Sequence, residues 1–140
     1  MKTLFHSKPS YFFAFLLCLV LLVLLAGCKG KGNAKGNTST GAVQAYLEAL
    51  VAKDANKLSE LSCKAWEPQA RQELDSFAAV TPTLKDLNCT KTGKGGDATL
   101  ISCSGKIVAN YNGEDQEINL SDRVFKAIEE GGEWRMCGYK

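Results

Sequence analysis

Residues 101–120 read ISCSGKIVANYNGEDQEINL, and this stretch decides the fold. Every second residue from Ile101 to Tyr111 is apolar, cysteine or glycine, which is the period of a strand with one buried face. Asn112-Gly113 favours a two-residue turn, because both positions tolerate positive φ. With the turn centred there, Ile107 faces Ile118 across the pair, and Gly105 faces Leu120. The stretch therefore predicts an antiparallel hairpin.

Further strands are predicted on either side of this hairpin. Residues 84–92 precede it, with Gly-rich residues 93–96 as the connecting turn, and the later strands cover residues 123–128 and 134–139. Connections this short join antiparallel neighbours. We therefore expect a four-stranded antiparallel meander, a count that leaves out the short return arm of the hairpin.

Residues upstream of the sheet have helical periodicity. Val43, Tyr46, Leu47 and Leu50 are spaced i, i+3, i+4 and i+7, after the capping hydroxyls of residues 38–40. Asp54 is a suitable cap for a second, short helix. A third helix is predicted over residues 69–79, with Leu74, Phe77 and Ala78 as its buried side and Pro82 beyond its end. Helices followed by antiparallel strands indicate an α+β fold with the helices packed on one face of the sheet.

The first 27 residues have the pattern of a lipoprotein signal peptide. Lys2 and Lys8 precede an entirely apolar run over residues 11–26, and the run ends in Leu25-Ala26-Gly27-Cys28. A retained membrane anchor is the alternative, but it needs about 20 apolar residues. We expect cleavage before Cys28, a lipid on Cys28, and an extracytoplasmic domain held at a membrane that the sequence does not identify as inner or outer.

Residues 28–40 are expected to be a flexible tether, and residues 41–140 a single domain. The tether is rich in Gly, Asn, Thr and Lys and cannot bury a core. Its lysines either attract anionic lipid headgroups, at about 1 kcal/mol each, or form a solvated spacer. The domain carries 12 basic and 15 acidic side chains, without the basic stripe of a nucleic-acid binder, so no nucleic-acid partner is expected.

The domain retains four cysteines: Cys63, Cys89, Cys103 and Cys137. An even number in an exported domain favours disulfides, of which four cysteines permit three connectivities. Folding the chain about the turn at residues 93–96 places Cys89 opposite Cys103, which leaves Cys63 for Cys137. Cys137 would point away from the core if Trp134 and Met136 point into it, unless a bulge intervenes. Neither zinc-ligand spacing nor a Cys-x-x-Cys redox motif is present, so no metal or cofactor is expected.

Two segments of the domain resemble a known superfamily. Residues 42–50 (AVQAYLEAL) with residues 54–58 (DANKL) are similar to the opening of nuclear transport factor 2-like domains, the cystatin-like cone fold. The ending GGEWRM, residues 131–136, is similar to their last strand. The resemblance implies a curved sheet wrapped around the first helix, with a cavity between them. The superfamily is functionally mixed, so the fold alone does not indicate an activity.

Catalysis is poorly supported by the sequence. The single histidine lies in the signal peptide, and no Gly-x-Ser-x-Gly elbow or phosphate loop occurs. Asp97 and Asp122 are either turn and edge residues or lone cavity carboxylates. The aromatic residues Tyr46, Tyr111 and Trp134, together with Trp66 and Tyr139, either form core or line an apolar pocket.

The sequence therefore favours a lipid-anchored, non-enzymatic domain that binds a protein, a peptide or a small apolar ligand. One alternative is a small hydrolase or isomerase that uses a cavity carboxylate. Another is a dimeric envelope scaffold that pairs through the open sheet face. A carboxylate-lined cavity would favour the hydrolase, and an apolar outer sheet face would favour the scaffold.

Overall fold

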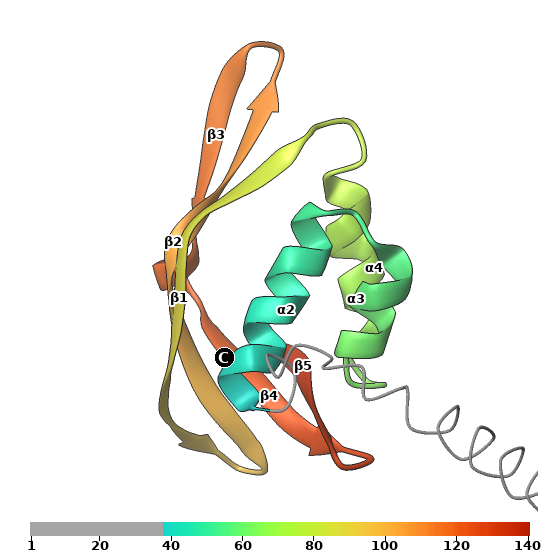
Figure 1. Cartoon of the computed structure of the whole chain (residues 1–140), viewed down its shortest axis with the longest axis vertical. Coiled ribbons are helices and arrows are strands. Elements are labelled where there is room, and N and C mark those ends of the chain that lie inside the picture. The colour runs from blue at the N-terminus through green and yellow to red at the C-terminus, as the bar shows by residue number, and fades with distance from the viewer. Residues whose placement is uncertain (1–37) are drawn as a thin grey trace, which may run out of the picture. The chain divides into compact units, whose positions relative to one another are not determined.

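The computed structural model describes residues 38–140, which form three helices on one face of a five-stranded antiparallel sheet (Figure 1). The α+β prediction is thus confirmed. The predicted signal peptide, Cys28 and most of the predicted tether lie outside the described residues. The elements are α2 (Ser39–Val51), α3 (Ala55–Leu61), α4 (Glu67–Ser76), β1 (Pro82–Gly95), β2 (Ala98–Tyr111), β3 (Glu114–Asn119), the 3-10 turn η2 (Leu120–Asp122), β4 (Val124–Glu130) and β5 (Glu133–Tyr139).

The first two helices begin at the predicted polar caps. The Thr38 hydroxyl accepts the backbone N–H of Gly41, and the Asp54 carboxylate accepts that of Lys57, each at 3.0 Å. The predicted stripe of α2 is buried against the sheet. The third helix differs from its prediction, because Pro68 occupies its first turn and it ends at Ser76. Ala78, expected to be buried, lies beyond that end and is exposed.

The sheet is forked and is not a simple meander, because one edge of β2 pairs with two different strands. The hairpin register is as predicted, with Ile107 opposite Ile118, but β3 ends at Asn119 and Leu120 begins η2. The first half of β2, residues 99–102, pairs with β4, and residues 106–111 pair with β3. The 14 residues of β2 are long enough for two partners end to end, so the four strands β1, β2, β4 and β5 form the main path of the sheet, and β3 is a fifth strand beside β2.

Gly105 lies where β1 bulges toward β2. The register of the two strands shifts between Lys85 and Asn88, and Gly105 has a φ of +100°. A Cβ atom at this glycine would lie 2.4 Å from the carbonyl oxygen of Lys85. Only a residue without a side chain permits this close approach of the two strands.

Two disulfides join the cysteines as paired in the sequence analysis: Cys63 with Cys137 and Cys89 with Cys103. Cys89 and Cys103 are direct partners in the β1–β2 ladder. Near Cys137 the β4–β5 register shifts, so that Phe125 pairs with Tyr139 but Ala127 pairs with Met136. Met136 is fully buried, and Cys137 reaches Cys63 because the segment that carries Cys63 lies beside β5, where the Cys63 N–H donates to the Met136 carbonyl at 2.8 Å.

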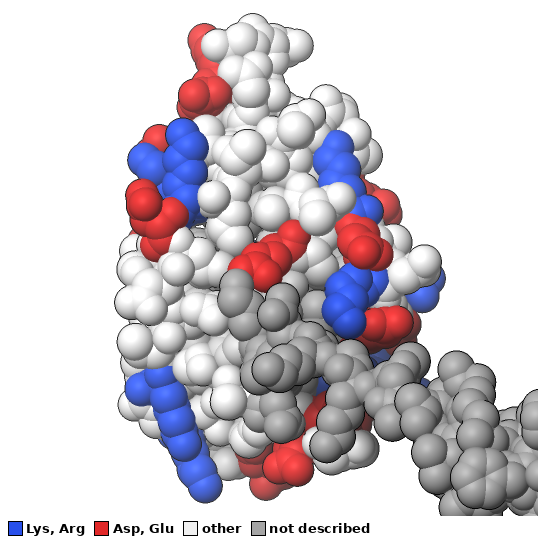
Figure 2. All heavy atoms as spheres, in the orientation of Figure 1, with Lys and Arg blue, Asp and Glu red and all other residues white. Residues whose placement is uncertain are grey.

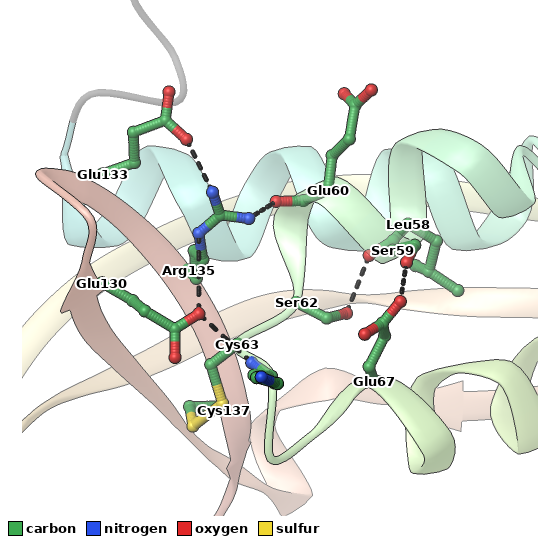
Figure 3. A network of polar contacts seen from close by, with 11 residues as sticks. Leu58, Ser59, Glu60, Ser62, Cys63, Glu67, Glu130, Glu133, Arg135 and Cys137 are labelled. Carbon is green, nitrogen blue, oxygen red and sulfur yellow. Dashed lines mark hydrogen bonds and ion pairs between the residues drawn. A yellow bond between two sulfur atoms is a disulfide. The ribbon is translucent and has the colours of Figure 1, made fainter.

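A polar network beside the first of these disulfides connects α3 to β5 (Figure 3). Arg135 pairs with Glu133 at 2.9 Å and with Glu130 at 3.9 Å, and it also donates to the backbone carbonyl of Glu60. Nearby, the Ser59 hydroxyl donates to Glu67 and lowers the pKa of that carboxyl. The network fixes the end of α3 against the last strand, and with it the start of α4.

Candidate functional site

A pocket of about 540 Å³ lies between α4 and the fork of the sheet. This volume is typical of small-molecule sites, which occupy about 300–1,000 Å³. Most residues of its apolar floor also belong to the hydrophobic core. The floor residues are Leu47, Leu50, Phe77, Ile107, Ile118, Leu120 and Phe125.

The rim of the pocket is polar because α4 turns a polar face toward the sheet. Gln69, Gln72, Glu73 and Ser76 all line the pocket, at the spacing i, i+3, i+4 and i+7. The spacing of the apolar residues in this helix does not point to Glu73. The signal that would have found it is this second stripe, which is polar and has helical spacing.

Glu73 is held in place by two tyrosine hydroxyls from different parts of the chain. The Tyr46 hydroxyl, from α2, donates to Oε2 at 2.7 Å, and the Tyr139 hydroxyl, from the end of β5, donates to Oε1 at 2.7 Å. The indole N–H of Trp66 in turn donates to the Tyr46 oxygen at 3.2 Å. Hydrogen bonds to a charged acceptor are stronger than neutral ones, so this arrangement fixes the carboxylate in one orientation.

Both tyrosines remain protonated donors. Burial raises the pKa of Tyr46 far above its usual range, and the negative charge of Glu73 raises it further. Burial also raises the pKa of Tyr139, with Glu73 again adding to the rise, while Arg123 opposes it. Each oxygen of Glu73 therefore accepts one hydrogen bond from a phenol hydroxyl and keeps a lone pair for a further donor.

A positive charge faces the same pocket. The Arg123 guanidinium carbon lies 4.9 Å from the centre of the Tyr139 ring, over its face. Tyr139 also packs edge-on against Trp66 and Phe125, with ring centres 5.4 and 5.3 Å away. The site thus combines an apolar floor with one fixed carboxylate and one stacked guanidinium.

Of the aromatic residues considered as pocket residues, Tyr46 reaches Glu73, and Trp66 and Tyr139 line the pocket. Tyr46, Tyr111 and Trp134 are not themselves among the lining side chains. Tyr111 lies at the tip of the β2–β3 hairpin, where it is 41% exposed and contacts the Ser76 carbonyl at 3.5 Å. Trp134 lies near the start of β5, and Tyr139 at its end, so the length of the strand separates Trp134 from the pocket.

The two aspartates weighed as cavity carboxylates are both exposed and outside this pocket. Asp97 lies in the turn between β1 and β2, and Asp122 lies in η2.

Within residues 38–140, no group of three His, Cys, Asp or Glu side chains could hold a metal ion. Over the same residues, no helix is long and apolar enough to span a membrane. On the face seen in Figure 2, acidic and basic side chains are interspersed.

Comparison with known proteins does not place the chain in a family. No family model matches it, and no curated protein does. Among solved structures, the helical cell shape determining protein Pgp2 from Campylobacter jejuni is similar in part, with 10% identity and a TM-score of 0.47. The similarity covers 71% of this chain and only 38% of that protein. A similarity of this size indicates neither a shared family nor a shared activity.

Proposed function

We propose that this protein is a lipid-anchored, extracytoplasmic binding domain whose ligand occupies the pocket beside Glu73. The observation that carries the proposal is the fixed carboxylate at the rim of an apolar pocket. A pocket with few, well-placed polar groups is the usual form of a ligand site. The anchor part of the proposal rests on the sequence pattern that ends at Cys28. We also propose that the domain is a cystatin-like cone.

Binding without turnover is favoured by the hydrogen bonds of Glu73. Both of its oxygens already accept hydrogen bonds from phenol hydroxyls, and neither tyrosine gives up its proton near neutral pH. A general base needs an oxygen that can take a proton from the substrate in reach of it. This carboxylate is better suited to accept a hydrogen bond from a ligand than to remove a proton.

A hydrolase or isomerase is the second candidate, because Glu73 is a carboxylate that lines the pocket. The two functions differ in what Glu73→Gln should do. In an enzyme, the change should abolish turnover while substrate still binds. In a binding domain, it should weaken ligand binding, and no product should form with the unaltered protein.

The pocket is tested by filling it. Ile118→Trp places an indole in the floor from β3, and Ile128→Trp is the matched control on β4, because Ile128 is also half-buried but lies outside the pocket. In a deletion strain complemented with each variant, we expect Ile118→Trp to lower competitive fitness and Ile128→Trp to restore it. Circular dichroism and immunoblotting verify folding and abundance. Equal fitness with both variants would show that the pocket is not the functional site.

The anchor is tested separately. Cys28→Ala should abolish partitioning of the protein into the detergent phase, because the lipid acceptor is removed. Asp97→Asn and Asp122→Asn serve as variants that should keep both partitioning and fitness. If Cys28→Ala still partitions fully, the apolar run over residues 11–26 is a retained anchor instead of a cleaved signal peptide.

A further inference from the structure

Arg123 differs from the other arginines of the described part of the chain. Arg71 pairs with Glu67 at 3.4 Å, and Arg135 pairs with Glu130 and Glu133. No carboxylate of residues 38–140 lies within ion-pair distance of Arg123, although it faces the pocket. Its charge is therefore available to a ligand.

The backbone and the side chain of Arg123 are both anchored. Its N–H donates to the Leu120 carbonyl at 3.3 Å, and the Leu120 side chain is buried in the pocket floor. Its guanidinium lies over the ring of Tyr139, whose hydroxyl is held by Glu73. A guanidinium carries five N–H donors, so the contact with Tyr139 leaves donors that can bind a carboxylate in two-pronged geometry.

The part of the rim that α4 supplies suits amide groups. Glu73 is already satisfied by two neutral donors and keeps lone pairs that accept N–H groups. Gln69 and Gln72 are exposed at the rim of the pocket, and their side chains offer both carbonyl and N–H groups. A fatty acid would complement Arg123 and the floor but would leave these polar groups without partners, which costs free energy when they are covered.

We propose that the pocket binds the carboxy-terminal end of a peptide whose last side chain is apolar. Arg123 binds the terminal carboxylate, the floor takes the side chain, and Glu73 with the glutamines binds the backbone amides. This assignment rests on the proposed function, since it names the ligand class of the same pocket. It draws on charge complementarity: the guanidinium has no carboxylate partner among residues 38–140, and the Glu73 carboxylate is placed to accept N–H groups.

The test is calorimetric titration of the full chain, purified in mild detergent, with N-acetyl-Leu-Leu as the free acid and as the carboxamide. We expect the free acid to bind about tenfold more tightly or better, because it makes charged hydrogen bonds to Arg123. Arg123→Gln should lower the affinity for the acid to that for the amide. Arg71→Gln, which removes an arginine from α4 outside the pocket, is the matched control and should keep the preference.

Other results separate the two proposals. Equal binding of acid and amide, with both lost in Ile118→Trp, would overturn the carboxylate assignment and support the pocket. Tighter, Arg123-dependent binding of octanoate would assign a fatty acid instead. If neither peptide binds while Ile118→Trp still lowers fitness, the peptide class is wrong and the pocket function stands. If neither peptide binds and fitness is unchanged, both proposals are wrong. Gln72→Trp, at the exposed rim, replaces Ile118→Trp should that variant fail to fold.

Discussion

The hydroxyl of Tyr46 donates a 2.7 Å hydrogen bond to Glu73, although the two residues lie on different helices and 27 positions apart. Tyr46 is fully buried in α2, and Glu73 is half-buried on α4. The bond therefore ties the core helix to the rim of the pocket. It makes the orientation of the pocket carboxylate depend on the packing of the core.

Tyr46→Phe should lower the free energy of unfolding by about 1–3 kcal/mol, because it removes a donor to Glu73 and leaves the Trp66 N–H without its acceptor. Tyr111→Phe is the control, since its hydroxyl is exposed and makes only a 3.5 Å contact, and it should change stability by less than about 0.5 kcal/mol. Urea denaturation measures both. Equal effects of the two changes would mean that the hydrogen bond to Glu73 does not contribute to the free energy of unfolding.

Stability should fall as pH rises above about 10, where the phenols of the unfolded chain ionise. The pKa values of Tyr46 and Tyr139 are raised in the folded protein, so the folded state keeps protons that the unfolded state loses. The stability that depends on the two protonated tyrosines is fully present below about pH 10 and is lost as the pH rises above that value. Unfolding midpoints between pH 8 and pH 11 measure it. Tyr139→Phe should make the decline shallower, and an unchanged slope would contradict the prediction.

Gly105→Ala should destabilise the protein by several kcal/mol or prevent folding. The new Cβ would meet the Lys85 carbonyl oxygen at 2.4 Å, and the backbone has positive φ. Gly93→Ala is the matched control in β1, because a Cβ there meets no atom within 4 Å. Thermal unfolding of the two variants should differ clearly. Similar midpoints would show that the β1 bulge moves to make room for the new Cβ without a loss of stability.

Loss of the Cys63–Cys137 disulfide should cost more than loss of Cys89–Cys103. The bonds close loops with sequence separations of 74 and 14 residues, which correspond to about 4.4 and 3 kcal/mol in the chain-entropy model. Replacing each pair with serines and measuring urea unfolding tests the order. A larger loss from the short loop would indicate that strain or contacts in the folded state outweigh chain entropy.

Local patterns in the sequence were sufficient for much of the fold. The stripe of α2, the caps Thr38 and Asp54, and the Ile107–Ile118 register all follow from side-chain spacing and turn chemistry, and the structure confirms them. These features depend on neighbours within a few residues or across one short turn. The pairing of β4 with the first half of β2 was not predicted, because it forms across η2, where no local pattern records it.

The sequence by itself determined the class of the domain, most of its secondary structure and the register of its central hairpin, because each depends on contacts close along the chain. Only the tertiary structure brought Glu73 between Tyr46 and Tyr139, and placed Arg123 over the Tyr139 ring. These residues come from α2, α4, the end of η2 and β5, so their meeting depends on how helices pack on the forked sheet. Side-chain spacing carries no information about contacts between elements so far apart in the chain.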